Sequence, residues 1–161
     1  MTTRLFCIGL LSSGLAFLPA DPARAASDKP VKVKASKVSS AKGREREKLF
    51  SDWMKAADLT KLSDKKRETG EQMVYFEYDE GKDLVRGIFM RGLLFDAWFY
   101  NIISGEKEME AQVNDYRKKN MVPLFVVLEG NFYCMLFVPA EQLGAAAKQV
   151  APLGIEPPAL K

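Results

Sequence analysis

The sequence contains no histidine in 161 residues, and its cysteines are Cys7 and Cys134 alone. Histidine is the commonest general base and a frequent zinc ligand. Its absence therefore excludes Ser-His-Asp and Cys-His arrangements in their usual forms, together with histidine-based zinc sites. Two cysteines this far apart also exclude thiolate zinc sites and a redox Cys-x-x-Cys motif. Glycine-rich phosphate-binding motifs are missing too, so nucleotide binding has no support. We expect no cofactor and no metal.

The N-terminus has the parts of a secretory signal peptide in their usual order. Arg4 precedes an apolar run from Leu5 to Leu18, then Pro19, and Ala23-Arg24-Ala25 fits the small-x-small rule for signal peptidase. We predict a signal peptide over residues 1–25, cleavage after Ala25, and a periplasmic or secreted mature chain. The apolar run has 14 residues, whereas a membrane-spanning helix needs about 20. Retention of this segment as a membrane anchor is the alternative.

Charge is unevenly distributed along the predicted mature chain. Residues 26–48 carry eight basic and three acidic side chains, and residues 49–161 carry 14 basic and 17 acidic ones. Residues 26–42 contain no large apolar side chain, which predicts a basic, disordered linker. The basic residues between 29 and 48 would allow weak contact with an anionic surface. Nucleic acid is not expected as a partner, because the remainder of the chain is slightly acidic.

Hydrophobic periodicity predicts one α+β domain over residues 43–151, followed by a proline-rich C-terminal tail over 152–161. The predicted fold is a mainly antiparallel sheet of about five strands with helices packed on one face. The strands are expected at 72–78, 84–90, 94–103, 121–128 and 132–138. The helices are expected at 43–57, 104–119 and 140–150, with a short helical stretch between Ser63 and Gly70.

A weak internal duplication is also indicated. Trp53 and Trp98 lie 45 residues apart, and each is followed by a charged helical stretch and two apolar strands around a glycine turn, at Gly81 and Gly130. Two copies of a helix and a hairpin would give this pattern.

Several aromatic residues lie on the predicted strands, and their role is not obvious from the composition. Trp98, Phe99, Tyr100 and Tyr133 fall on predicted strands. Neighbours on a strand point to opposite faces, so Trp98 and Tyr100 share one face and Phe99 lies on the other. These four residues are either core contacts or a surface that binds another protein. The leading hypothesis is an exported, non-catalytic binding module whose partner is another extracytoplasmic protein. Self-association through an uncovered edge strand, giving a homo-oligomer, is a further alternative.

A small hydrolase that works without histidine is the competing hypothesis. Paired carboxylates can hydrolyse glycosidic bonds, and four acidic residues cluster around one predicted turn: Glu77, Asp79, Glu80 and Asp83. Ser104 and Lys107 fit the Ser-x-x-Lys nucleophile motif, although its companion motifs are missing. Ser104 also fits the N-cap of the helix that follows it.

Overall fold

The computed structural model describes residues 30–92 and 94–161. The predicted signal peptide, residues 1–25, and its cleavage site lie outside these ranges. Among the described residues, no helix is both long and apolar enough to cross a bilayer.

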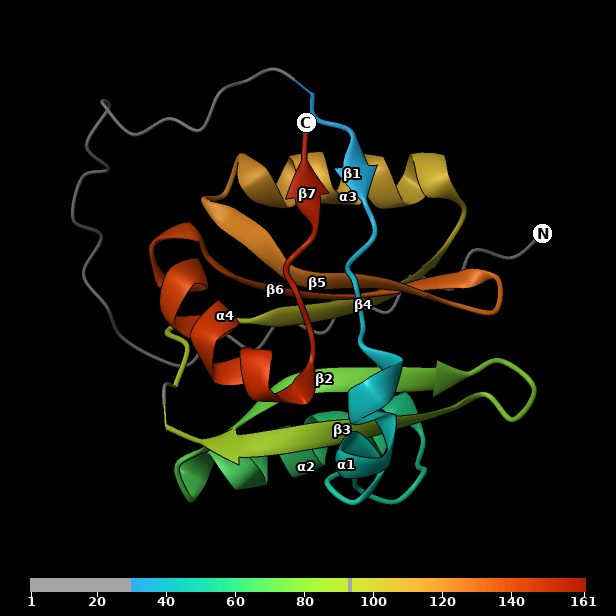
Figure 1. Cartoon of the computed structure of the whole chain (residues 1–161), viewed down its shortest axis with the longest axis vertical. Coiled ribbons are helices and arrows are strands. Elements are labelled where there is room, and N and C mark those ends of the chain that lie inside the picture. The colour runs from blue at the N-terminus through green and yellow to red at the C-terminus, as the bar shows by residue number, and fades with distance from the viewer. Residues whose placement is uncertain (1–29, 93) are drawn as a thin grey trace.

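Two antiparallel sheets form the centre of the molecule (Figure 1). The first pairs β2 (Glu71–Asp79) with β3 (Leu84–Arg91). The second has the order β4-β6-β5 and is built from β4 (Phe99–Ser104), β5 (Met121–Glu129) and β6 (Phe132–Pro139). The predicted α+β class and antiparallel pairing are confirmed. The five long strands, however, form two sheets rather than one.

Helices cover the outer side of each sheet. α2 (Ala56–Glu68) packs on β2 and β3, whereas α3 (Glu106–Arg117) packs on β4, β5 and β6. β2 in turn packs against β5 and β6, which gives the succession of helix, sheet, sheet and helix visible in Figure 1. α4 (Leu143–Val150), which follows the short η3 (Ala140–Gln142), contacts both sheets at one end. Each sheet therefore has a helix on one face and the other sheet on its second face.

Aromatic side chains fill the space between the sheets. The rings of Tyr75 and Phe76 lie 4.9 and 5.5 Å from the ring of Phe125, and all three side chains are buried. Cys134 is buried in the same cluster as an unpaired cysteine. Burial raises the pKa of its thiol well above the ordinary value. Cys134 therefore serves as a small apolar core residue, as its apolar neighbours predict.

The two halves of the fold repeat one another. β2 and β5 are both nine residues long and begin fifty residues apart, at Glu71 and Met121, and each follows a helix by a short turn. Both strands also have an irregularity at the equivalent place, between Met73 and Tyr75 and between Pro123 and Phe125. The duplication is therefore visible as two helix–hairpin units. Equivalent residues of β2 and β5 are fifty positions apart. Trp53 and Trp98 lie 45 residues apart and are therefore not equivalent.

The predicted helix over 43–57 ends early. α1 spans only Gly43–Glu47, and the chain then runs extended beside β3, where Phe50 pairs with Ile88 and Met54 with Val85. The apolar spacing that suggested a helix instead supplies strand-like contacts. α2 begins at Ala56 and continues through the short helical stretch predicted after Ser63.

β4 is shorter than predicted. Residues 94–98 are not a strand, and β4 begins at Phe99. Phe95 is buried, and its carbonyl oxygen accepts a hydrogen bond of 2.5 Å from Arg67. This side-chain contact takes the place of a backbone ladder at the start of the predicted strand.

The described part of the segment expected to be a disordered linker pairs with the proline-rich C-terminal tail. β1 (Val33–Lys34) forms an antiparallel ladder with β7 (Ala159–Leu160), and Val38 forms a bridge with Ile155. We call residues 31–39 with 154–161 the terminal ribbon; η4 (Ala151–Leu153) leads into it and η2 (Ser40–Lys42) follows β1. The buried Arg46 fixes its inner end by donating hydrogen bonds of 2.8 Å to the carbonyls of Ser39 and Leu153. The composition of residues 30–42 did not predict this pairing, because the contacts are mainly between backbone groups.

Candidate functional site

Three of the four predicted binding residues lie at β4. The ring of Tyr100 stacks on that of Trp98 at 6.0 Å, and the Tyr100 side of this pair faces the core. Tyr100 is only 6% exposed, and its hydroxyl lies 2.6 Å from the hydroxyl of Thr60 and donates to the carbonyl of Ala56 at 3.0 Å. Tyr100 thus ties β4 to α2, while Trp98 is half-buried beside it.

Phe99 and Tyr133 lie on the other face of the sheet, which α3 covers. Both are half-buried against the cluster under α3, and the ring of Phe99 lies 5.4 Å from that of Tyr116. The four aromatics therefore do not share one exposed face. They support β4 from both sides and leave part of Trp98 and Phe99 accessible next to it.

β4 is an edge strand with β6 as its strand neighbour in the described chain. Three other long strands lie at sheet edges: β2, β3 and β5. Residues 72–76 of β2 are buried. The outer edge of β5 is bonded at Val126 by the backbone and side chain of Ser36, and it contains Pro123. The outer edge of β3 is bonded at Val85 by Met54.

The sequence of β4 lacks the features that usually protect an edge. It reads Phe-Tyr-Asn-Ile-Ile-Ser, with no charge and no proline, and its pairing with β6 runs without a register shift. Natural proteins usually blunt an exposed edge with lysine, proline or a bulge. β4 is therefore the part of the sheet best suited to accept another strand.

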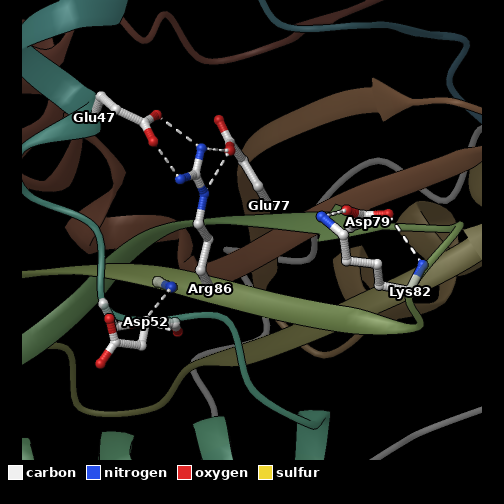
Figure 2. A network of polar contacts seen from close by, with 8 residues as sticks. Glu47, Asp52, Glu77, Asp79, Lys82 and Arg86 are labelled. Atoms are coloured by element: carbon white, nitrogen blue, oxygen red, sulfur yellow. Dashed lines mark hydrogen bonds and ion pairs between the residues drawn. The ribbon is translucent and has the colours of Figure 1, made fainter.

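One acid of the predicted carboxylate cluster, Glu77, is paired with Arg86, as Figure 2 shows. The guanidinium donates to both carboxylate oxygens of Glu47, at 2.6 and 2.8 Å, and to Glu77 at 2.7 and 3.0 Å. It also stacks on aromatic rings, with its central carbon 4.0 Å from the centre of Phe50 and 4.5 Å from that of Trp53. Burial opposes the charged form of Arg86, but the hydrogen bonds that it donates to the two carboxylates outweigh this effect and raise its pKa.

The other three acids of that cluster are also paired. Asp79 contacts Lys82 at 3.0 Å, which with backbone hydrogen bonds lowers its pKa. Asp83 lies 3.7 Å from Lys55. Glu80 accepts hydrogen bonds from the amide of Asn131, which joins the tips of the two hairpins. Among the described residues, no group of three potential ligands could hold a metal ion.

Glu129 is an acidic residue that the sequence reasoning missed. It lies at the end of β5, and its pKa is raised, first by burial and then by the negative charge of Glu77. The cluster was sought within one hairpin, whereas Glu129 comes from the other. The fifty-residue repeat, which makes Glu129 equivalent to Asp79, is the signal that could have found it.

Ser104 and Lys107 lie three residues apart at the β4–α3 junction, and both are exposed. Ser104 is the last residue of β4, and the N-cap of α3 is Gly105. The predicted N-cap at Ser104 is therefore wrong. The structure gives no contact between the Ser104 hydroxyl and the Lys107 amine among the described hydrogen bonds.

No protein-family model, no curated protein and no solved structure matches the chain.

Proposed function

We propose that this chain is an exported, non-catalytic binding module that engages another extracytoplasmic protein by accepting an extended segment along β4. The observation that carries the proposal is an edge strand without charge, proline or bulge. Among the other long edge strands, β3 and β5 are bonded at their outer edges by other parts of the chain, and β2 is largely buried. The partner would add one strand to the β4-β6-β5 sheet.

The surroundings of β4 suit such a role. Tyr100 anchors the strand to α2 from one face, and Ile103 packs in the cluster under α3 from the other. A strand held on both faces loses little conformational entropy when a partner binds, which favours affinity. Main-chain hydrogen bonds would supply general affinity, and alternate side chains of the partner would meet the half-exposed Phe99 and Ile102.

Site-directed photo-crosslinking in the native host tests this proposal. The photoreactive residue replaces Ser104, which is exposed at the end of β4, and in a parallel sample it replaces Lys65, exposed on α2. The same capture is repeated with Phe99→Lys, which places an ammonium group beside the edge while its aliphatic stem keeps contact with the sheet. Leu128→Lys is the matched control, because Leu128 is 51% exposed on β5. Circular dichroism verifies that all forms fold.

We expect one extracytoplasmic protein to crosslink at residue 104 and not at 65, and to be lost with Phe99→Lys but not with Leu128→Lys. A crosslink to a second copy of the chain would replace the proposed partner by self-association. Equal capture at both positions, or equal loss with both lysine variants, would contradict a binding edge at β4.

A second candidate function rests on Glu129 and Glu77. One carboxyl has a raised pKa and its neighbour is ion-paired with Arg86, a difference that acid catalysis by paired carboxylates requires. Purified chain and a Glu129→Gln variant would be compared on a panel of glycoside substrates. Turnover by the parent that the variant lacks would favour a hydrolase over the binding module.

A further inference from the structure

The outward face of the terminal ribbon carries a row of lysines. Lys32 and Lys161 exchange both backbone hydrogen bonds, at 2.8 and 3.0 Å, so they are directly opposite each other in the antiparallel ladder. Directly opposite residues project their side chains to the same face of a ladder, and Lys34, two residues after Lys32, projects to that face too. All three side chains belong to exposed residues.

The inward face of the ribbon is fixed on α3, so the lysine row has one orientation. Val33 is buried and Leu160 is partly buried in the cluster under α3. The N–H groups of Val31 and Val33 donate to the side chains of Asn114 and Glu110, at 2.9 and 3.4 Å. Figure 1 shows β1 and β7 crossing the front of the molecule beside α3. The ribbon therefore presents Lys32, Lys34 and Lys161 to solvent.

These lysines lack the neutralising partners that several other lysines of the fold have. Lys55, Lys66 and Lys82 each form an ion pair. No side-chain ion pair within the described ranges involves Lys32, Lys34 or Lys161. Like charges directly opposite in a ladder destabilise it. The row is not neutralised within the described part of the fold and is therefore available to an external anionic partner.

We propose that this lysine face docks the chain on the surface of a bilayer that contains anionic phospholipid. A bilayer presents many phosphates over an area, so it can meet three separate ammonium groups on an exposed ribbon without a binding pocket. The position of the ribbon agrees with this partner. Eleven residues separate Leu18, the end of the apolar N-terminal run, from Pro30, and they reach at most about 40 Å. In the uncleaved chain, an apolar run lodged in the bilayer would hold the ribbon close to the head groups. After cleavage, the lysines alone would provide a weak, salt-sensitive contact.

Vesicle sedimentation with the chain from Ala26 onward tests the proposal. Vesicles of phosphatidylcholine, with and without phosphatidylglycerol, are used at low and raised salt. The ribbon variant replaces three lysines: Lys32→Gln, Lys34→Gln and Lys161→Gln. The matched variant has the same net charge and replaces three exposed lysines on other elements: Lys65→Gln, Lys107→Gln and Lys148→Gln.

We expect binding only to the vesicles that contain phosphatidylglycerol, and weaker binding at raised salt. Each lysine should contribute a factor of about tenfold or less to the affinity for the vesicles. The ribbon variant, which lacks all three, should therefore bind about a hundredfold more weakly. The matched variant should bind nearly as the parent does. Matching thermal unfolding curves would verify that all three forms are folded.

Three results would overturn the proposal: no vesicle binding by the parent, equal losses in the two variants, or equal binding without phosphatidylglycerol. Inorganic phosphate is added as a competitor at constant ionic strength. Displacement by it would assign the lysine face to a free anion instead of a bilayer. Because the ribbon and β4 are separate surfaces, none of these results decides whether β4 accepts a partner strand.

Discussion

Arg86 offers the clearest quantitative test of how this fold is held together. Its guanidinium is largely buried, at 14% side-chain exposure, and Glu77 is 21% exposed, whereas Glu47 is 62% exposed. Replacing Arg86 by alanine would remove the cation from Glu77 and leave that carboxylate shielded from water. It would also remove the contacts of the guanidinium with Phe50 and Trp53.

The expected loss can be built from these contacts. Charge-assisted hydrogen bonds contribute about 1.5–3 kcal/mol, and a shielded cation–π contact contributes about 1–2 kcal/mol. The pair with Glu47 adds little, because an exposed ion pair is screened by solvent. We therefore predict that Arg86→Ala lowers the free energy of unfolding by about 3 kcal/mol, within the range for breaking a shielded ion pair.

Urea unfolding of the chain from Ala26 onward, followed by tryptophan fluorescence, measures this loss. Lys82→Ala is the control: Lys82 also pairs with an acid and lies 5.9 Å from the ring centre of Trp53, but its side chain is 65% exposed. It should change the unfolding free energy little. A loss for Arg86→Ala as small as that for Lys82→Ala would refute the view that burial and stacking make Arg86 stabilising.

Three further substitutions test other parts of the structure. Tyr100→Phe removes the hydroxyl that bonds α2 at Thr60 and should cost about 1 kcal/mol in urea unfolding; no change would mean that this bond does not hold β4 in place. Glu129→Gln should make the chain more stable at neutral pH. The raised pKa of Glu129 means that its contribution to stability is complete below its unfolded pKa of about 4.3 and is lost as pH rises through the folded pKa. The advantage of the variant should therefore vanish in unfolding curves at acidic pH, and an advantage that is equal at all pH values would contradict this cause. Gly154 has φ +72°, and a Cβ there would lie 2.7 Å from that of Ser39. Gly154→Ala should therefore lower the free energy of unfolding by about 2 kcal/mol and speed hydrogen exchange of the amides in the terminal ribbon. Unchanged exchange would show that the chain has room for a side chain at this position.

The sequence predicted the hairpins well because each had two local signals. Apolar alternation and a turn with glycine identified both β5 and β6, whose observed bounds differ from the prediction by one residue. The sequence could not show which faces of the strands pack against one another. Strands apolar on both faces suggested a single covered sheet, but the same pattern arises when two sheets pack together and each has a helix outside it.

The terminal ribbon and Glu129 escaped prediction for a common reason. Val33 pairs with Leu160, and Glu129 is influenced by Glu77, so each depends on residues distant in sequence. Composition describes a segment by itself, and residues 26–42 have the composition of a linker. Trp98 and Tyr100 were correctly placed on one face of the chain, yet only the position of α2 explains why Tyr100 is buried.

Hydrogen exchange of the amides of Phe99–Ser104, with and without the protein captured at residue 104, tests strand addition at β4 most directly. If the partner adds a strand there, alternate amides of β4 should gain protection on binding, while those of β5 and α2 should not change. Protection that appears on other elements while the amides of β4 exchange as before would contradict strand addition at β4.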